Sequence, residues 1–340
     1  MWSLGAPGSS RCRHADPPDQ LDEGGLYTCV MVEQKSIYVA GHTGLVGSAI
    51  LRQLERRGRT SIITASHQEL DLREQASVWG FMEQTRPDQV IVAAGTVGGI
   101  HANRSRPAEF LYDNTMIHAN VIDAAHRVGV EKLLYLGSSC IYPRLSPQPI
   151  PESALLTGPL EPTNEAYALA KIAGIAMCDT YRTQYGCNFI SAMPTNLYGP
   201  YDRFDPEFGH VLPALLRKCH EAAQRGDAVV EVWGSGRAIR EFMHADDLAD
   251  ACLFLLDHFD EPGPINVGTG VEVSIAELAT LLRDLICPGM ELRFDPSMPD
   301  GTPRKLLDSS RLAALGWTAS ISLSAGIDST YRWFRENVAS

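Results

Sequence analysis

Short apolar runs alternate with longer amphipathic segments over the first half of the chain. The runs are rich in β-branched residues and almost continuously apolar, which is typical of strands buried on both faces of a sheet. The segments between them have the length and apolar period of helices. This alternation predicts a parallel sheet of the doubly wound α/β class. The predicted strands are Ser36–Ala40, Ser61–Ala65, Gln89–Ala94, Lys132–Gly137 and Asn188–Met193, and the predicted helices are Leu45–Arg57, Arg73–Thr85, Pro107–Val128 and Asn164–Tyr185.

The sequence changes character after Pro194, where Gly, Pro, Asp and aromatic residues become frequent. Further strands are predicted at Val229–Trp233 and Ile265–Val267. Ser274-Ile-Ala-Glu277 predicts a capping box that opens a helix reaching about Ile286. We therefore expect a main domain formed by residues 35–194 and 231–263, and a smaller C-terminal lobe formed by residues 195–230 and 264–335.

The first 34 residues differ from everything that follows. They are rich in Gly, Pro, Ser and Asp and have almost no apolar periodicity. A segment of this composition cannot bury enough apolar surface to offset the entropy of ordering it. Residues 1–34 are therefore predicted to be a disordered N-terminal extension.

Charge and cysteine content narrow the classes of partner. The 340 residues include 41 acidic and 29 basic side chains, a formal net charge of −12. Such a chain is poorly suited to nucleic acid or an anionic membrane, and no apolar run is long enough to span a bilayer. Its eight cysteines lack C-x-x-C spacing, which indicates free thiols, no metal site and a reducing compartment, by default the cytosol.

A glycine-rich string follows the first predicted strand directly and opens the next helix. Glycines allow a sharp turn and a close approach to a pyrophosphate, and the helix N-terminus offers free N–H groups. The spacing is G-x-x-G-x-x-G rather than G-x-G-x-x-G, so a plain structural turn is the alternative. Its place between strand and helix favours dinucleotide binding in a Rossmann-type domain, by Gly41, His42, Thr43, Gly44, Leu45, Val46 and Gly47.

The end of the second predicted strand favours NADP over NAD. An NAD site usually has an acidic residue there to bind the ribose 2′-hydroxyl, and the nearest acid in this chain is Glu69. Asp71 and Leu72 lie just beyond, where they could contact the adenine or cap the next helix. The polar residues that would tolerate a 2′-phosphate, without an arginine to reinforce them, are His42, Thr43, Ser66 and His67.

Tyr167 and Lys171 lie four residues apart in an alanine-rich predicted helix. This spacing puts both side chains on one helix face. The ammonium group would lower the pKa of the phenol from about 10, so that the phenol can act as an acid or base near neutral pH. Such a pair usually consists of two residues on an exposed helix face with no catalytic role. The glycine loop upstream favours a catalytic role here.

Ser138 and Cys140 follow the fourth predicted strand. If the chain stays extended there, both side chains point to the same side, because the side-chain period of a strand is two. The serine could then donate a hydrogen bond to a carbonyl oxygen. The cysteine is either a small buried apolar residue, as most cysteines are, or a thiolate base.

Several longer strings together resemble a known family, the extended short-chain dehydrogenase/reductases that act on nucleotide sugars, and more closely the GDP-L-fucose synthases among them. The resemblance covers roughly residues 36–335. The strings that support it, besides the glycine loop and Arg240-Glu-Phe-Met-His244-Ala-Asp246, are Gly137-Ser-Ser-Cys-Ile-Tyr-Pro143, Glu161-Pro-Thr-Asn-Glu-Ala-Tyr167, Met193-Pro-Thr-Asn-Leu-Tyr-Gly-Pro200 and Val232-Trp-Gly-Ser-Gly236.

The resemblance implies two epimerisations and one reduction of a GDP-linked 4-keto-6-deoxy sugar. Cys140 matches the base that removes the protons at C3 and C5, and His210 the acid that returns protons to the opposite face. NADPH then reduces C4, while Tyr167 protonates the oxygen, Lys171 assists and holds the nicotinamide ribose, and Ser138 binds the C4 oxygen.

The resemblance also implies binding residues. Lys171, His210 and the string Pro194, Thr195, Asn196 and Leu197 would contact the cofactor, whereas the smaller lobe would bind the GDP-sugar. Arg240 suits a pyrophosphate because its guanidinium can bind two oxygens at once. Arg203 lies in the aromatic-rich loop and could touch sugar or cofactor. The residues that correspond to GDP-sugar contacts are Lys218, Trp233, Arg240 and Asp308.

Two alternatives remain open at the level of sequence. A related 4-epimerase or 4,6-dehydratase would share the fold, although a dehydratase needs an acid pair near the serine and a 4-epimerase needs no thiol base. A catalytically silent dinucleotide-binding protein would be expected to lack Tyr167 or Lys171. Family analogy further suggests a homodimer that pairs the helices Pro107–Val128 and Asn164–Tyr185 of two subunits.

Overall fold

Six parallel strands form the central sheet of the computed structural model, which describes residues 34–298 and 300–339. The strand order is β2-β1-β3-β4-β5-β9, and every neighbouring pair is parallel. The chain leaves β1 toward β2 and then crosses to the other side, which confirms the predicted doubly wound class. The strands are β1 (Ile37–Ala40), β2 (Ile62–Ile63), β3 (Gln89–Val92), β4 (Lys132–Leu136), β5 (Phe189–Pro194) and β9 (Pro264–Val267).

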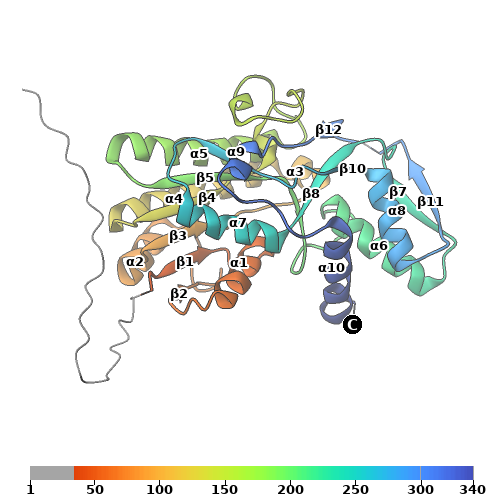
Figure 1. The fold of residues 1–340 in the computed structure, drawn as a ribbon, viewed down its shortest axis with the longest axis horizontal. Helices are drawn as coiled ribbons and strands as arrows, with labels where there is room; N and C mark the ends of the chain where they lie inside the picture. Colours follow the sequence, from red (N-terminus) through yellow and green to blue (C-terminus); the bar gives the residue numbers. More distant parts are fainter. Residues whose placement is uncertain (1–33, 299, 340) are drawn as a thin grey trace, which may run out of the picture. The chain divides into compact units, whose positions relative to one another are not determined.

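Helices cover both faces of this sheet (Figure 1). Side chains alternate between the faces: Ile37 and Val39 pack with α1 and α7, whereas Tyr38 and Ala40 pack with α2, α4 and α5. All four are buried, which explains why the strand shows no polar alternation. These helices are α1 (Leu45–Arg56), α7 (Ala245–His258), α2 (Gln75–Thr85), α4 (Pro107–Val128) and α5 (Glu165–Tyr185).

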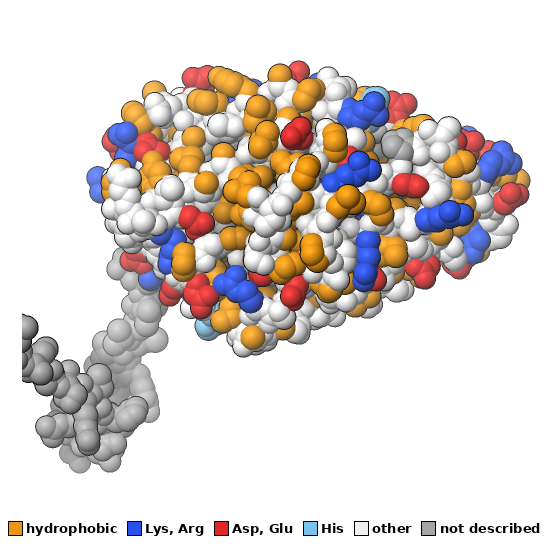
Figure 2. Space-filling view, turned by 90° about the horizontal axis from the view of Figure 1, so that it is seen from above, with side chains coloured by type: hydrophobic (Ala, Val, Ile, Leu, Met, Phe, Trp, Pro, Cys, Tyr) orange, Lys and Arg blue, Asp and Glu red, His pale blue; other side chains and the backbone are white. Residues whose placement is uncertain are grey.

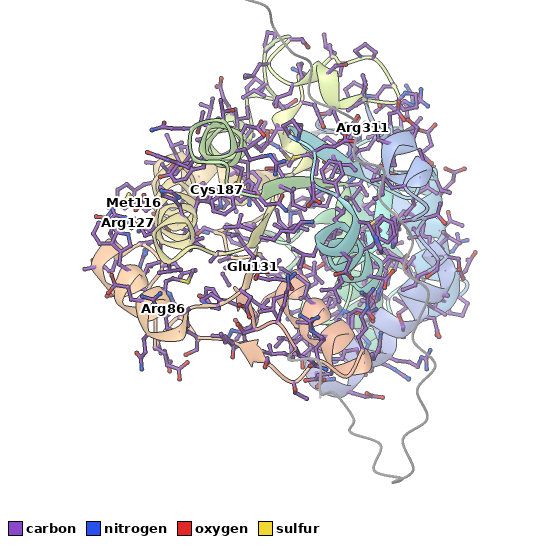
Figure 3. All side chains as sticks on the ribbon, turned by 60° about the vertical axis from the view of Figure 1, so that its left-hand side comes forward. Arg86, Met116, Arg127, Glu131, Cys187 and Arg311 are labelled. Atoms are coloured by element: carbon purple, nitrogen blue, oxygen red, sulfur yellow. The ribbon has the colours of Figure 1, made fainter. Side chains whose placement is uncertain are left out.

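The helices α4 and α5 lie side by side on one face of the sheet, as Figure 3 shows, with Met116 and Arg127 labelled on α4. Their outer sides expose large apolar residues that the sheet does not use. The space-filling view in Figure 2 shows apolar side chains gathered over the middle of one face of the molecule. The exposed apolar residues of α4 and α5 are Leu111, Tyr112, Leu169 and Tyr185.

A second group of strands has its own apolar core, built with three helices. β8 pairs with β10, β12 and β6, and β7 pairs with β11. The predicted capping box is confirmed, because Ser274 and Glu277 bind each other's backbone at the start of α8. The elements are β6 (Asn196–Tyr198), β7 (Val229–Trp233), β8 (Ile239–His244), β10 (Glu272–Ser274), β11 (Glu291–Asp295), β12 (Arg304–Lys305), α6 (Val211–Arg225), α8 (Ile275–Ile286) and α10 (Leu323–Asn337).

Short helices complete the described chain. α3 (Ile100–Ser105) and α9 (Ser310–Ala314) are each less than two turns long. Two 3₁₀ turns, Ser139–Ile141 and Glu152–Ala154, follow β4. The first of them replaces the extended segment that the sequence predicted after Gly137.

The sheets divide the chain differently from the predicted ranges at two places, and one strand was not predicted. β9 is the sixth strand of the central sheet, although 264–335 was assigned to the smaller lobe. β7 and β8 belong to the smaller sheets, although 231–263 was assigned to the main domain. β11 lies in a segment without a clear apolar period. The predicted disordered extension, residues 1–34, lies outside the described residues except for Gln34.

Glu241 of β8 is a buried carboxylate that holds these sheets to one another. The residue is 0 % exposed. Its Oε1 accepts hydrogen bonds from the backbone N–H of Thr269 (2.6 Å) and Gly270 (2.8 Å), which follow β9. Its Oε2 accepts one from Leu307 (3.2 Å), which follows β12. Burial raises the pKa of this carboxyl, and the three N–H groups oppose that rise.

Replacing this carboxylate should destabilise the fold. Glu241→Leu leaves three buried N–H groups without an acceptor, so we expect the free energy of unfolding to fall by about 3 kcal/mol or more in urea denaturation. Glu272→Gln is the control, since its partly exposed ion pair with Arg304 should contribute less than about 1 kcal/mol. An unfolding free energy of Glu241→Leu equal to that of the wild type would contradict this role.

Candidate active site

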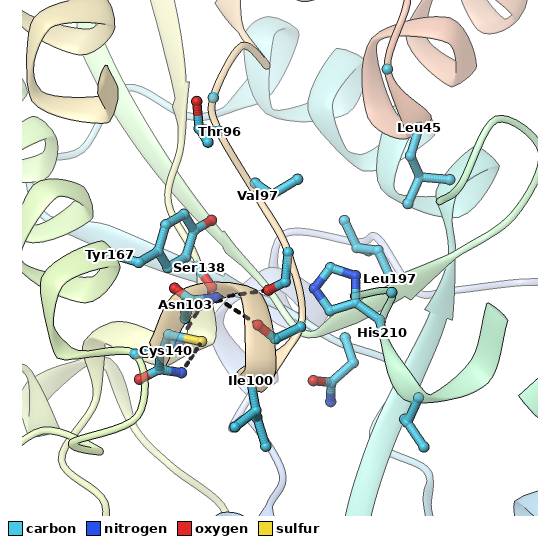
Figure 4. A pocket seen from close by; sticks show the side chains of 18 of the residues that line it. Leu45, Thr96, Val97, Ile100, Asn103, Ser138, Cys140, Tyr167, Leu197 and His210 are labelled. Atoms are coloured by element: carbon cyan, nitrogen blue, oxygen red, sulfur yellow. Dashed lines mark hydrogen bonds between the residues drawn. The ribbon is translucent and has the colours of Figure 1, made fainter. Parts of the chain in front are cut away.

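A pocket of about 880 Å³ opens at the carboxyl ends of β1, β3, β4 and β5. Ligands of doubly wound sheets bind at this edge. Figure 4 shows Ser138, Cys140 and Tyr167 grouped on one side of the pocket and His210 on the other. Residues from both groups of strands line the pocket, so a ligand could touch the central sheet and the smaller sheets at once.

The glycine loop forms one end of the pocket and is built for a close backbone approach. Gly41 has φ +83°, and a Cβ on it would lie 2.6 Å from the Cα of Ala94. A Cβ on Gly47 would lie 2.1 Å from the carbonyl oxygen of Gly41, so Gly47 packs helix against turn and does not itself line the pocket. The helix α1 begins at Gly44 without a side-chain cap or an acid in its first turn. Its free N–H groups fit an anionic phosphate.

The residues after β2 line the same end of the pocket. His67, Asp71 and Leu72 do so as the sequence predicted, together with Arg73, which it did not single out. Arg73 binds Asp71 and Asp113 through its guanidinium, and it holds the pKa of Asp71 at about 2. Glu69 instead accepts hydrogen bonds from the N–H and hydroxyl of Ser66 and does not line the pocket.

Ser138 and Cys140 both line the pocket, although the chain between them is not extended. Ser138 caps the 3₁₀ turn, and its hydroxyl accepts a hydrogen bond from the N–H of Cys140 at 3.3 Å. The turn, and not strand alternation, therefore brings the two side chains to the same cavity.

Tyr167 and Lys171 lie on the pocket side of α5. Lys171 is 4 % exposed and donates a hydrogen bond to the carbonyl oxygen of Leu136 at 2.7 Å. Its Nζ is 5.8 Å from the centre of the Tyr167 ring. Burial raises the pKa of the phenol, and the nearby Ser138 hydroxyl opposes this. The sequence predicted the reverse direction, because it could not include the cost of removing water from the phenol.

A buried histidine and tyrosine lie behind Lys171. The His118 ring contacts the Tyr135 hydroxyl through Nδ1 (3.0 Å) and Lys171 Nζ through Nε2 (3.5 Å). Burial lowers the pKa of His118, and the neighbouring ammonium lowers it further. Tyr135 of β4 also meets Gly174 of α5, where an added Cβ would lie 2.4 Å from the tyrosine ring. This close approach fixes the height of α5 above the sheet.

His210 stands directly before α6 on the opposite wall of the pocket. His210 is an exposed residue whose ring faces the pocket; partial desolvation by the pocket walls lowers its pKa, and the Lys305 ammonium lowers it further. Because histidine side chains titrate near neutral pH, they can exchange a proton with a bound molecule at a modest cost in free energy.

The far end of the pocket carries positive charge. Lys218 Nζ lies 4.3 Å from the centre of the Trp233 ring, and both residues line the pocket with Arg240. Arg240 donates to the backbone oxygen of Asp300 at 3.1 Å. Burial lowers the pKa of both cations. These groups offer an aromatic face and two charges to an anionic ligand.

The prediction for Asp308 is wrong as far as the pocket is concerned. Asp308 does not line it; its carboxylate accepts from the N–H of Ser310 at the start of α9. Asp300 lines the pocket in its stead. Asp300 lies eight residues upstream of Asp308, in a segment where the sequence offers no apolar periodicity.

Some of the remaining predicted residues line the pocket and others do not. Pro194, Thr195, Asn196 and Leu197 line the pocket, whereas Arg203 does not and lies against Phe208. Residues that the sequence did not single out also line the cavity. Asn103 donates to the backbone oxygens of Gly98 and Gly99, as Figure 4 shows. Other polar lining residues of this kind include Thr96, Asp113, Asn164 and Lys305.

Within residues 34–298 and 300–339, no group of three or more His, Cys, Asp or Glu side chains is arranged to hold a metal ion. Of the helices in the described part of the chain, none combines the length and apolarity needed to cross a membrane.

The buried lysine should make stability depend on pH. Burial lowers the pKa of Lys171 to about 7, whereas a lysine in an unfolded chain titrates near 10.4. Between these pH values the unfolded chain binds a proton that the folded chain has released, so the free energy of unfolding gains a positive slope with pH. In the protein without added nucleotide, Lys171→Met should therefore have a smaller slope than the wild type from pH 7 to 10. Parallel pH profiles in urea denaturation would contradict the lowered pKa.

Comparisons with known proteins agree with this geometry. The model of the NAD dependent epimerase/dehydratase family matches residues 37–268. GDP-L-fucose synthase 1 of Arabidopsis thaliana is 57% identical over 302 residues, which are 89% of this chain and 94% of that protein. GDP-L-fucose synthase of Escherichia coli (strain K12) is 51% identical over 315 residues, 90% of this chain and 98% of that protein.

A solved structure is similar as well. The crystal structure of a GDP-L-fucose synthetase from Naegleria fowleri bound to NADP superimposes with a TM-score of 0.83 and 30% sequence identity, and the match covers 90% of this chain and 95% of that one. The similarity in sequence and the similarity in structure therefore both extend over about 90% of this chain. The chain belongs to the NAD dependent epimerase/dehydratase family and, within it, to the GDP-L-fucose synthases.

Proposed function

We propose that this protein converts GDP-4-keto-6-deoxy-D-mannose to GDP-L-fucose by 3,5-epimerisation followed by reduction at C4. One observation supports this above the others: a thiol, an imidazole and a phenol, those of Cys140, His210 and Tyr167, line a single pocket beside the glycine loop. A bare reductase would need the phenol alone. A base and a second acid are what the two epimerisations add to that requirement.

The cofactor of the proposed reaction is NADP. The backbone cradle at Gly41 and Gly47 and the uncapped start of α1 fit a pyrophosphate. His42, Thr43 and His67 line the end where a 2′-phosphate would lie, and the Naegleria relative is described as bound to NADP. When bound, the reduced cofactor supplies the hydride. Lys171, Pro194, Thr195, Asn196 and Leu197 line the wall where the nicotinamide end would be held.

The epimerising steps use the two opposite walls of the pocket. Protons at C3 and C5 are acidified by the neighbouring C4 carbonyl, so a mild base can remove them. Cys140 takes each proton on one face of the ring, and protonated His210 donates a proton to the other face. Between the two epimerisations the Cys140 thiol releases its proton to solvent and His210 takes one up. His210 suits this donor role because the lowered pKa of its ring makes the protonated form a stronger acid.

The reduction then uses the wall formed by α5 and β4. Ser138 holds the C4 oxygen by a hydrogen bond, and Tyr167 donates the proton that this oxygen needs as charge develops on it. Lys171 lies within reach of that charge, and the Leu136 carbonyl and His118 fix its ammonium in place. Arg240, with Lys218 and Trp233, would bind the GDP portion at the far end.

We also propose the wider setting of the enzyme. The exposed apolar residues of α4 and α5 support a homodimer formed through these helices. The six described cysteines are free, which supports a reducing compartment such as the cytosol. The sheet topology supports a division into a nucleotide-binding domain and a smaller substrate-binding lobe, with the strand β9 in the former and β7 and β8 in the latter.

A substrate-dependent assay tests the proposed function directly. The purified protein should oxidise NADPH when GDP-4-keto-6-deoxy-D-mannose is added, and more slowly or not at all with NADH. The absence of turnover at micromolar enzyme would exclude the proposal. The product should co-elute with GDP-L-fucose, since reduction without epimerisation gives a different sugar.

Two variants should separate the steps. Cys140→Ser should slow deuterium exchange at C3 and C5 by a factor of 100 or more, that is about 10²–10⁴ for loss of a general base, while NADPH binding stays intact. Tyr167→Phe should retain exchange but lose most of the reduction. Normal exchange in Cys140→Ser, or full reduction in Tyr167→Phe, would show that the role assigned to that residue is wrong.

A further inference from the structure

The sulfur of Cys140 has two polar neighbours that come from distant parts of the chain. The side-chain amide of Asn164, directly before α5, donates to Sγ at 3.2 Å, and this bond is drawn in Figure 4. Nζ of Lys305, on β12, lies 3.7 Å from the same sulfur. Both residues line the pocket. A sulfur that accepts from an amide and an ammonium is in the surroundings of a thiolate, because the thiol form is a poor acceptor.

The charge of Lys305 is not neutralised by a carboxylate among the described residues. Its Nζ forms no ion pair within 4.0 Å there, and its one hydrogen bond is to Cys140. The neighbour Arg304 does have such a partner, since it binds Glu272 with Nε–Oε2 at 2.8 Å. The register of β12 against β8 sets Lys305 opposite Arg240. The strand therefore turns one cation toward the sulfur and the other toward a carboxylate.

Other charged and titratable groups also face the thiol. Arg240 and Lys171 lie near enough for their charges to be coupled to that of Cys140. Glu161 lies on the same wall but forms an ion pair with Arg144 at 3.2 Å. Tyr167 is uncharged at neutral pH, because burial raises its pKa. The groups around the sulfur thus favour a negative charge on it, and Lys305 is the cation in hydrogen-bond contact.

We propose that Lys305 and Asn164 are positioning residues that hold Cys140 as a thiolate in the resting protein. This deepens the proposed function, since a thiolate is the form of Cys140 that could remove the C3 and C5 protons. The contact with Lys305 is a property of the folded chain and does not depend on which substrate is bound. Lys305 also lies close to His210, and its ammonium disfavours protonation of that ring.

Thiol reactivity tests this without any substrate. In the full chain, the rate at which iodoacetamide alkylates Cys140 is followed against pH by peptide mass spectrometry, and Cys140→Ser gives the background from the other cysteines. In Lys305→Gln the pH midpoint should rise by about one unit or more, since an opposite charge at this distance shifts a pKa by about 1–3 units. Lys305→Arg keeps the positive charge, so its midpoint should stay close to that of the wild type.

A substitution of Asn164 gives an independent test, because it adds a negative charge near the sulfur instead of removing a positive one. Asn164→Asp keeps the shape of the side chain but replaces the N–H donor by a carboxylate, so the midpoint should also rise. Arg304→Gln is the matched control for charge, because it removes a cation from the same strand that faces Glu272. Its midpoint should equal that of the wild type. Unchanged midpoints in folded Lys305→Gln and Asn164→Asp, judged by thermal unfolding, would overturn the proposal.

The pH profile of deuterium exchange separates this inference from the proposed function. If both hold, the exchange rate of Lys305→Gln should have its pH dependence displaced upward by the same amount as the alkylation midpoint. If the alkylation midpoint is displaced in Lys305→Gln but the wild-type protein catalyses no exchange, the proposed function is refuted and the thiolate is still supported. An alkylation midpoint that does not move, with active wild-type enzyme, would refute the inference alone.

Discussion

A buried carboxylate that forms no ion pair among the described residues holds the two halves of the pocket together. Glu241 satisfies its charge through backbone N–H groups that follow β9 and β12, so it ties the central sheet to the smaller sheets. Arg240 precedes it on β8, and Lys305 is paired with Arg240 across the strand register. The positions of the two cations relative to the sulfur on the opposite wall therefore depend on this one set of hydrogen bonds. Low local dielectric makes such bonds strong and their loss costly.

The local parts of this architecture could be predicted from sequence. Each strand and helix of the central sheet has its own apolar period, and the glycine loop and the Tyr167–Lys171 spacing are contained within a few residues. The pocket wall formed by β12 could not be predicted in this way, because Lys305 and Cys140 are 165 residues apart and no periodicity joins them. Asp308 was named from the family resemblance alone, and the structure shows that Asp300, and not Asp308, lines the pocket.

Electrostatic properties were the least predictable, since they depend on burial as much as on neighbours. Spacing alone suggested that Lys171 lowers the pKa of Tyr167, whereas removal of water dominates and shifts the two groups in opposite directions. Burial thereby shifts both side chains toward their uncharged forms before a ligand arrives. In the proposed reaction, negative charge developing at the C4 oxygen would favour the protonated form of Lys171.

The contact between Gly174 and Tyr135 has a consequence for the evolution of this enzyme. The helix that presents Tyr167 and Lys171 rests on the tyrosine ring at a position where only a hydrogen atom fits. A larger residue at position 174 would move the side chains of Tyr167 and Lys171 together away from Ser138. Neither side chain would itself be changed. The residues allowed at position 174 are thus limited by the need to keep Tyr167 and Lys171 in place. A homologue could lose activity through a substitution here while all of its active-site motifs stay intact.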